Sequence, residues 1–378
     1  MSLRHFVPFL AAFLGYDACA GDFLYSSGFQ QRLRVNGYYV GYERNLYPIS
    51  EVDFSAVTHL MVGRVTPTAS GGVTTNFDID NTNGPIFATQ SSDAAHAAGA
   101  KAVLMVGGAG EINGWRGAAT PANRATFVSN LLSTMDTLHF DGLDLDWEPL
   151  ETGDYPNFLA LAQALRSARP NMILTVPVGW INSNFSATAD PFYGTISSVF
   201  DQINVMTYDM AGDYPGWQSW HASALAGETG NTPSSIATSI DYYRRAGVPA
   251  AKLGIGAGFY GNCWRNVTQP HQTGGTLQAS DGAMSYKNIM TSYYSAANRQ
   301  WDTIAKVPYL SSAAPMGAQA CNFVSYDDAE SIAAKGAFTR ANNLGGIIIW
   351  TISQGHLTAP PVGQRDPLLA ALRAAFLQ

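Results

Sequence analysis

Residues 141–148 carry four carboxylates separated by apolar side chains, and polar and apolar positions alternate with the period of a β-strand. Side chains two positions apart in a strand point to the same face, so Asp144, Asp146 and Glu148 share one face. Neighbouring acids on that face lie roughly 6.5 to 7 Å apart. Carboxylates at this spacing repel one another when all are ionised. We therefore expect at least one to keep its proton well above the usual pKa of an acid.

This row of acids has two other interpretations. A calcium-binding loop needs alternating oxygen ligands, a turn glycine and a distant Glu, whereas Leu143, Leu145 and Trp147 separate these acids. A solvated charged strand would not place three large apolar side chains between its charges. We therefore interpret the segment as a buried strand whose acids take part in catalysis.

The composition restricts the partners of the chain. Its 378 residues are 46% hydrophobic and 13% charged, which is enough apolar material for a large core. A formal net charge of −7 argues against nucleic acid or an anionic membrane as a partner. The seven histidines show no paired ligand spacing, so we expect no metal and no cofactor. A neutral polymer is compatible with this charge, and the aromatic content of 12% suits stacking on sugar rings.

The N-terminus predicts a secretory signal peptide over residues 1–20, followed by a linker over 21–34. A basic start precedes an apolar run at 6–14, and residues 18–20 form a small-x-small cleavage site. The alternative is a buried first element of the fold. A membrane anchor is not expected, because the apolar run is well under the roughly 20 residues that a spanning helix needs. The sequence thus predicts a secreted, extracellular protein.

Eight apolar segments have the length and composition of β-strands, and helical patterns lie between most of them. The segments are 35–41, 57–65, 101–107, 140–146, 172–178, 202–208, 253–260 and 346–351. Eight alternations of strand and helix predict a (β/α)8 TIM barrel over residues 35–378. The active site of such a barrel lies at the C-terminal ends of its strands, and Glu148 falls just past the end of the fourth.

Capping patterns predict where three helices begin. Pro121 would be the first helical residue of one helix, and residues 231–233 would begin another. Asp327 with Glu330 would form a capping box before a third. The glycine-rich run at 254–258 resembles half of a dinucleotide-binding fingerprint, but it lies within a strand and no capped helix follows closely, so we reject that function.

The spacing Asp-x-x-Asp-x-Asp-x-Glu at 141–148 resembles the signature of family 18 glycoside hydrolases, the chitinases and their relatives, at every fixed position. The resemblance extends over almost the whole chain after residue 35. Residues 206–209 resemble the family's Met-x-Tyr-Asp motif, and residues 37–39 resemble its first strand. Trp350 stands where the family places a tryptophan on the eighth strand.

This resemblance implies hydrolysis of β-1,4 linkages between N-acetylglucosamine units of chitin, with retention and by substrate-assisted catalysis. Glu148 would protonate the leaving oxygen, while the acetamido oxygen of the sugar attacks the anomeric carbon to form an oxazolinium ion. Asp146 would then bind the acetamido N–H, and Tyr208 would donate to the acetamido carbonyl. Asp144 would share a proton with Asp146. Asp141 would support the strand.

The resemblance also implies the residues that bind substrate. Asp209 would help bind the distorted sugar, and Trp350 and Trp217 would form stacking platforms. The whole expected set is Asp209, Met206, Trp350, Tyr38, Trp217 and Tyr260. The expected partner is chitin or an N-acetylglucosamine oligosaccharide, with no nucleic acid and no membrane, and we expect a monomer.

Three positions depart from the family's pattern. Met105 replaces a serine that usually contacts the deep aspartate, which leaves Tyr38 as the main expected hydrogen-bond donor to Asp144. Ala109 replaces a frequent tryptophan at the mouth of the cleft, and Asn262 replaces the usual arginine after the seventh strand. None of these changes removes the acid or its partner, so we expect activity with an altered rate and pH profile.

The seventh unit of the barrel is too long for a plain loop, since about 65 residues separate Gly261 from the helix near Asp327. The segment at 262–325 resembles the small α+β insertion that many family 18 enzymes carry between strand 7 and helix 7 as a wall of their cleft. Cys263 and Cys321 lie near its two ends. A disulfide between them would contribute roughly 3 to 4 kcal/mol by closing this loop. Two free buried thiols are the alternative.

Two other functions are compatible with the sequence. An endo-β-N-acetylglucosaminidase acting on N-glycan cores shares the acid motif, although the insertion favours a linear polymer. A chitin-binding lectin on the same barrel usually lacks the terminal glutamate, whereas Glu148 is present.

Overall fold

The computed structural model describes residues 32–185 and 188–378. The predicted signal peptide over 1–20 and nearly all of the linker over 21–34 lie outside the described residues. No helix in the described part of the chain is long and apolar enough to cross a membrane.

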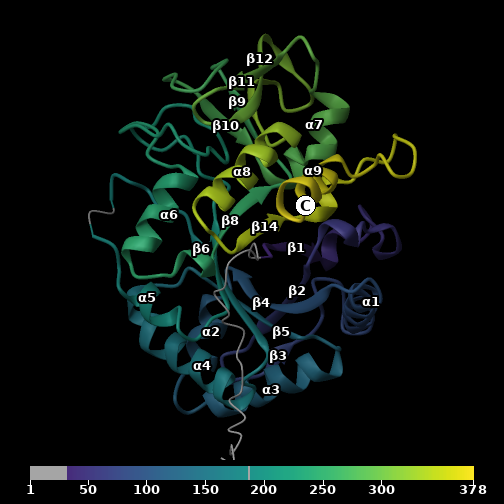
Figure 1. Ribbon diagram of the computed structural model, residues 1–378, viewed down its shortest axis with the longest axis vertical. Helices are drawn as coiled ribbons and strands as arrows, with labels where there is room; N and C mark the ends of the chain where they lie inside the picture. The colour runs from purple at the N-terminus through teal and green to yellow at the C-terminus, as the bar shows by residue number, and fades with distance from the viewer. Residues whose placement is uncertain (1–31, 186–187) are drawn as a thin grey trace, which may run out of the picture. The chain divides into compact units, whose positions relative to one another are not determined.

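Within residues 32–185 and 188–378, eight parallel strands form a closed barrel (Figure 1). The strand β1 pairs with both β2 and β14, and this double pairing closes the sheet. In barrel order the strands are β1 (Arg34–Val40), β2 (His59–Pro67), β4 (Lys101–Ala109), β5 (Gly142–Glu148), β6 (Ile173–Gly179), β7 (Gln202–Met206), β8 (Leu253–Gly258) and β14 (Gly346–Trp350). Each of them overlaps a predicted strand, so the predicted barrel is confirmed. Glu148 is the last residue of β5 and not a residue beyond it.

Helices follow most of the strands and surround the barrel (Figure 1). They are α1 (Asn83–Ala97), α2 (Ile112–Ala118), α3 (Arg124–Thr137), α4 (Tyr155–Ala168), α5 (Phe192–Ile196), α6 (Ile236–Arg245), α8 (Ala329–Ala341) and α9 (Pro367–Phe376). A short strand, β3 (Val73–Thr74), pairs with the end of β2.

Two of these helices begin later than their capping patterns predict. Pro121 lies in the turn before α3, which begins at Arg124, because the fixed φ of proline suits a turn as well as a first helical residue. The predicted start at 231–233 is also wrong. The hydroxyl of Ser235 accepts a hydrogen bond from the backbone N–H of Thr238, so Ser235 caps α6.

The alternation in β5 sorts its side chains between the barrel interior and the helices outside. Leu143 and Leu145 are fully buried in the main hydrophobic core. Trp147 stacks on Trp115 of α2 with ring centroids 5.2 Å apart, and it meets the ring of Phe158 of α4 at 6.0 Å. This apolar outer face fixes the strand, and the acids of the other face consequently point into the barrel.

A second sheet lies between β8 and α8 in the chain. It is antiparallel, in the order β10-β9-β13-β12-β11 (Figure 1). Its elements are β9 (Asn262–Arg265), β10 (Thr276–Ala279), α7 (Tyr286–Ser292), β11 (Arg299–Asp302), β12 (Val307–Met316) and β13 (Cys321–Ser325). The predicted α+β insertion between strand 7 and helix 7 of the barrel is thus present.

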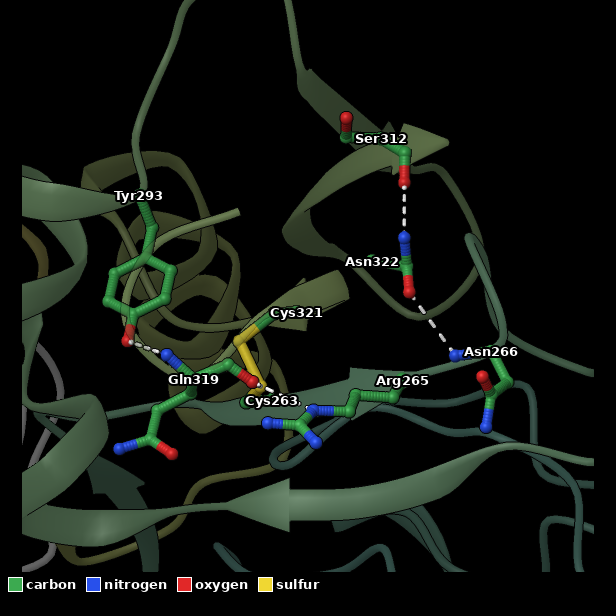
Figure 2. Close-up of a disulfide and its surroundings, with 8 residues drawn as sticks. All are labelled: Cys263, Arg265, Asn266, Tyr293, Ser312, Gln319, Cys321 and Asn322. Carbon is green, nitrogen blue, oxygen red and sulfur yellow. Dashed lines mark hydrogen bonds between the residues drawn. A yellow bond between two sulfur atoms is a disulfide. The ribbon is translucent and has the colours of Figure 1, made fainter. Parts of the chain in front are cut away.

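Figure 2 shows the disulfide that joins Cys263 on β9 to Cys321 on β13. It links two neighbouring strands of the second sheet, and the two cysteines have a sequence separation of 58. The carbonyl of Gln319 beside it accepts a hydrogen bond from Nε of Arg265 at 2.9 Å, and the backbone N–H of Gln319 donates to the Tyr293 hydroxyl at 3.2 Å. The predicted pairing is confirmed, and it ties the two ends of the insertion together.

The third predicted helix start is wrong by one residue. Asp328, and not Asp327, caps α8 and forms the capping box with Ser331. Asp327 has a different partner: Nζ of Lys335 donates to both of its carboxylate oxygens, at 2.6 and 2.5 Å. The same ammonium donates to the hydroxyl of Ser223 at 2.8 Å. This ion pair is fully buried and joins α8 to the loop that follows β7.

We expect Lys335→Met to destabilise the protein by about 3 to 5 kcal/mol, because it leaves the Asp327 carboxylate buried without its cation. The midpoint of urea unfolding measures this loss. The matched control is Lys101→Met, which removes an exposed lysine paired with Asp141 and should cost less than about 1 kcal/mol. Equal midpoints for the two variants would contradict the importance of the buried pair.

Candidate active site

The three acids of β5 line the mouth of the barrel in order of decreasing depth. Asp144 is fully buried, Asp146 is 4% exposed and Glu148, at the end of the strand, is partly exposed. On the neighbouring strand β4, Gly107 lies opposite Asp146 and Ala109 lies opposite Glu148. Ala109 lines the open space beside Glu148, whereas a Cβ atom on Gly107 would lie only 2.3 Å from Nε1 of Trp115.

Two hydroxyl groups hold the deepest acid. Tyr38 on β1 donates to Oδ2 of Asp144 at 2.7 Å, and Thr175 on β6 donates to Oδ1 at 2.5 Å. Burial raises the pKa of Asp144 to about 6, although both hydrogen bonds oppose that rise. The expectation that Tyr38 is the main donor is therefore incomplete. Thr175 supplies a second hydroxyl from the strand on the opposite side from Met105.

The two outer acids behave as an interacting pair. Burial, followed by the charges of Glu148 and Asp144, raises the pKa of Asp146 well above its ordinary value. Burial also raises the pKa of Glu148. Oδ1 of Asp146 is buried and has no hydrogen-bond partner among the described residues. A buried acceptor without a donor is unfavourable, so this oxygen is suited to a donor that arrives with a ligand.

Two cavities of about 230 and 210 Å³ meet at these acids. Both are lined by Ala109, Asp146, Glu148 and Trp350. The first extends to Val40, Tyr42, Arg64, Asp78, Met105 and Gly108. The second extends to Tyr38, Pro177, Met206, Tyr208, Asp209 and Asp281. Asp146 and Glu148 thus border open space in both cavities.

Glycines of β8 make room for two tyrosines at the mouth of the barrel. A Cβ atom on Gly256 would lie 2.9 Å from the ring of Tyr208, and a Cβ atom on Gly258 would lie 2.6 Å from the ring of Tyr260. The glycines at 256 and 258 therefore allow these two side chains to pack closely against β8. Burial raises the pKa of Tyr208 well above its ordinary value, so its hydroxyl remains a hydrogen-bond donor.

Tyr260 reaches the site through another residue. Its hydroxyl donates to Oδ2 of Asp209 at 2.6 Å, and its ring packs behind Tyr208 with centroids 6.3 Å apart. Tyr260 lines neither of the two described cavities, so the structure gives it a supporting position behind Asp209.

The two predicted tryptophan platforms differ in position. Trp350 lines both cavities and packs against Tyr38 with ring centroids 5.4 Å apart. Trp217 lines neither described cavity; it packs against Trp180 and Tyr214 at centroid distances of 6.3 and 5.0 Å. The structure therefore brings Trp350 to the acids and places Trp217 beside Trp180, the residue that follows β6.

Several residues at the site were not predicted from the sequence, and three of them have polar side chains that matter for the acids or the cavity walls. These three are Thr175, Arg64 and Asp281. A polar residue at an inward position of an otherwise apolar strand was the available signal for Thr175. Asp281 belongs to the insertion, and it accepts a hydrogen bond from Nε2 of Gln354 at 2.7 Å. Nothing in the sequence near Asp281 indicates that it lines the second cavity.

Other predicted positions lie away from the acids. Asp141 accepts hydrogen bonds from Nζ of Lys101 at 2.9 Å and from the backbone N–H of Ala102 at 2.9 Å, before the start of β5. Asn262 is fully buried in β9 and lines neither described cavity. Among the described residues, no group of three or more His, Cys, Asp or Glu side chains is arranged to hold a metal ion.

Residues 34–355 match the model of the glycosyl hydrolases family 18, and the chain belongs to this family. It is similar to Chitinase A1 of Niallia circulans, with 30% identity over 292 residues that cover 67% of this chain and 40% of that protein. It is also similar to a chitinase-like effector of Moniliophthora perniciosa, with 26% identity over 90% of this chain and 86% of that protein. The chain thus spans less than half the length of the Niallia relative.

Among solved structures, the Group IV chitinase of Ostrinia furnacalis in complex with allosamidin is similar, with 25% identity and a TM-score of 0.77. The similarity covers 91% of this chain and 99% of that one. The barrel and its insertion therefore have the architecture of a known chitinase.

We expect Thr175→Val to raise the pKa of Asp144 above about 6, because the ionised carboxylate loses one of its two hydroxyl donors. Thr175→Ser keeps the hydroxyl and should leave the pKa near its original value. The pH dependence of the Asp144 carboxyl ¹³C chemical shift measures both. An unchanged or lowered pKa in the valine variant would show that Thr175 does not stabilise the charge.

Proposed function

We propose that this protein is a chitinase that hydrolyses β-1,4 linkages between N-acetylglucosamine units with retention, by substrate-assisted catalysis. The observation that carries the proposal is the buried, unpartnered Oδ1 of Asp146 beside Glu148 in an open cavity. An acetamido N–H supplies the donor that this oxygen lacks. A hydroxyl at the same position would also donate, but only an acetamido group brings its own nucleophilic oxygen.

Glu148 acts as the general acid. It lies at the outer end of the row, where it lines both cavities and meets the bond between two sugars. Burial raises its pKa, so it keeps a proton at a higher pH than an exposed glutamate does. The protonated carboxyl donates to the glycosidic oxygen as the bond breaks, and the carboxylate that results activates water for the second step.

Asp146 binds the acetamido N–H and stabilises the positive charge of the oxazolinium ion. Its raised pKa means that it shares protons with Asp144 and Glu148 before substrate binds. Tyr208 lines the second cavity and donates to the acetamido carbonyl oxygen. The sugar oxygen is thereby turned towards the anomeric carbon, which is the orientation that attack requires.

Aromatic and polar side chains of the cavities bind the sugar chain. Trp350 forms the platform under the reacting sugar, and Met206 and Asp209 line the same cavity. Tyr260 holds the carboxylate of Asp209 in place through its hydrogen bond. In this proposal Trp217, with Trp180, contributes a more distant stacking surface.

The partly buried Glu148 with its raised pKa supports an enzyme over a lectin. The insertion contributes Asp281 to the second cavity, which supports a cleft bounded on that side. Product analysis on chitin oligomers and on a high-mannose glycopeptide distinguishes a chitinase from an endo-β-N-acetylglucosaminidase.

We also propose that the protein is secreted as a monomer after removal of residues 1–20. The predicted signal peptide supports this. The disulfide between Cys263 and Cys321 is compatible with folding in an oxidising compartment.

We expect Glu148→Gln to lower kcat on a chitin oligomer by at least about 10²-fold, because a positioned proton donor contributes that much or more. The matched control is Glu151→Gln, an exposed glutamate three residues further along the chain, which should keep the activity. Equilibrium binding of the oligomer should survive in both variants. A Glu148→Gln enzyme with a nearly normal rate would refute the assignment of the acid.

A nucleophile that belongs to the substrate disappears when the acetyl group is removed. We therefore expect no cleavage of fully deacetylated chitosan or of cellulose, and competitive inhibition by a thiazoline analogue of the intermediate. Reducing-end release from each polymer, at equal enzyme concentration, measures the selectivity. Efficient hydrolysis of cellulose would require a nucleophile from the protein and would contradict the mechanism.

A further inference from the structure

Arg64 brings a positive charge to the acids. It lies on β2 and lines the first cavity together with Asp146 and Glu148. Among the described residues that line the two cavities, it is the one cationic side chain. Its side chain is 24% exposed, so water screens its charge only partly.

Three contacts fix the guanidinium. Nη1 donates to the carbonyl of Gly107 at 3.0 Å, and Gly107 is the residue of β4 that lies opposite Asp146. Nε donates to Oδ2 of Asp78 at 3.0 Å, and Nη2 lies 3.4 Å from Oε1 of Glu111. The charge of Arg64 is therefore held against the strand next to the acids.

The backbone of β4 is shaped to admit this side chain. Gly108 has a φ of +103°, and a Cβ atom there would lie only 3.0 Å from Nη1 of Arg64 and 3.6 Å from its Cδ. Any other residue at 108 would crowd the guanidinium, which would have to shift by a few tenths of an ångström, and would also strain the backbone. The glycine thus permits the close approach of Arg64 to β4, at the cavity that Asp146 and Glu148 also line.

We propose that Arg64 is a positioning residue for the acid pair, and that its fixed charge sets the pH range in which Asp146 and Glu148 hold the protons that catalysis needs. The part of this inference that concerns the pH range of activity rests on the proposed function. The part that concerns the ionisation of the two acids does not depend on it. A fixed cation stabilises ionised carboxylates and so opposes the effect of burial. The charge of Arg64 has this effect on both Asp146 and Glu148. It partly offsets the rise in their pKa values that burial causes.

The other titratable groups around the pair are acids and phenols. Tyr38 of β1, Asp144 of β5, Tyr208 and Asp209 after β7, and Asp281 of the insertion face it from the barrel and the second cavity. Asp78, Glu111 and Tyr42 lie around Arg64 itself. When ionised, these groups are negative and raise the pKa of a neighbouring carboxyl. None of them could replace the positive charge of Arg64.

The test compares the pH profile of kcat/KM on a soluble chitin oligomer for three variants. Arg64→Met removes the charge and should move both the acidic and the alkaline limb to higher pH, by about 0.5 to 1 unit, because both acids then bind protons more tightly. Arg64→Lys keeps the charge and should move them much less. Arg245→Met removes an exposed arginine of α6 in the same way and should leave both limbs in place.

A second measurement separates this proposal from the proposed function. The carboxyl ¹³C shifts of Asp146 and Glu148 titrate without any turnover, and both pKa values should rise in Arg64→Met. If the wild-type protein cleaves no chitin oligomer, the proposed function fails while this titration still tests Arg64. Unchanged pKa values, or equal shifts in the methionine and lysine variants, would overturn the proposal.

If Arg64→Met does not fold, Glu111→Gln tests the effect of the Arg64 charge by removing a neighbouring anion. It removes an anion 3.4 Å from the guanidinium and leaves the cation less compensated. Both pKa values should then fall, and both limbs should move to lower pH. A rise would contradict the role of Arg64.

Discussion

The repulsion between three carboxylates buried along one face of β5 is the constraint on which the rest of the site depends. The structure surrounds each of the three acids differently. Asp144 is the deepest and receives two hydroxyl hydrogen bonds, Asp146 keeps one oxygen without a partner, and Glu148 lies at the rim. Because burial raises all three pKa values, the row retains protons at a pH where separate acids would have lost them.

The residues that pack around β5 hold its three acids in place. The outer side of β5 is fixed by the stacking of Trp147 on Trp115, which leaves the strand no freedom to turn its acids outward. Tyr208 and Tyr260 pack against β8 only because Gly256 and Gly258 have no side chain. The buried pair of Lys335 and Asp327 joins α8 to the loop after β7.

The sequence predicted what depends on local periodicity and missed what depends on pairing across strands. The alternation in 141–148 was sufficient to predict the face of the acids, and the chain length after Gly261 predicted the insertion. Thr175 lies 31 residues from Asp144, and only the register of β5 against β6 brings them together. Arg64 was missed for the same reason. The capping errors are smaller, because several polar residues near each helix start compete to be the cap.

The anomeric form of the first product tests the central claim most directly. If the acetamido oxygen of the substrate attacks one face of the sugar and water later attacks the other side of the intermediate, the configuration is retained. Proton NMR of a chitin oligomer digest in its first minutes, before mutarotation, should therefore show the β-anomer at the new reducing end. An α-anomer would mean direct displacement by water, and it would contradict the roles of Asp146 and Glu148 in substrate-assisted catalysis.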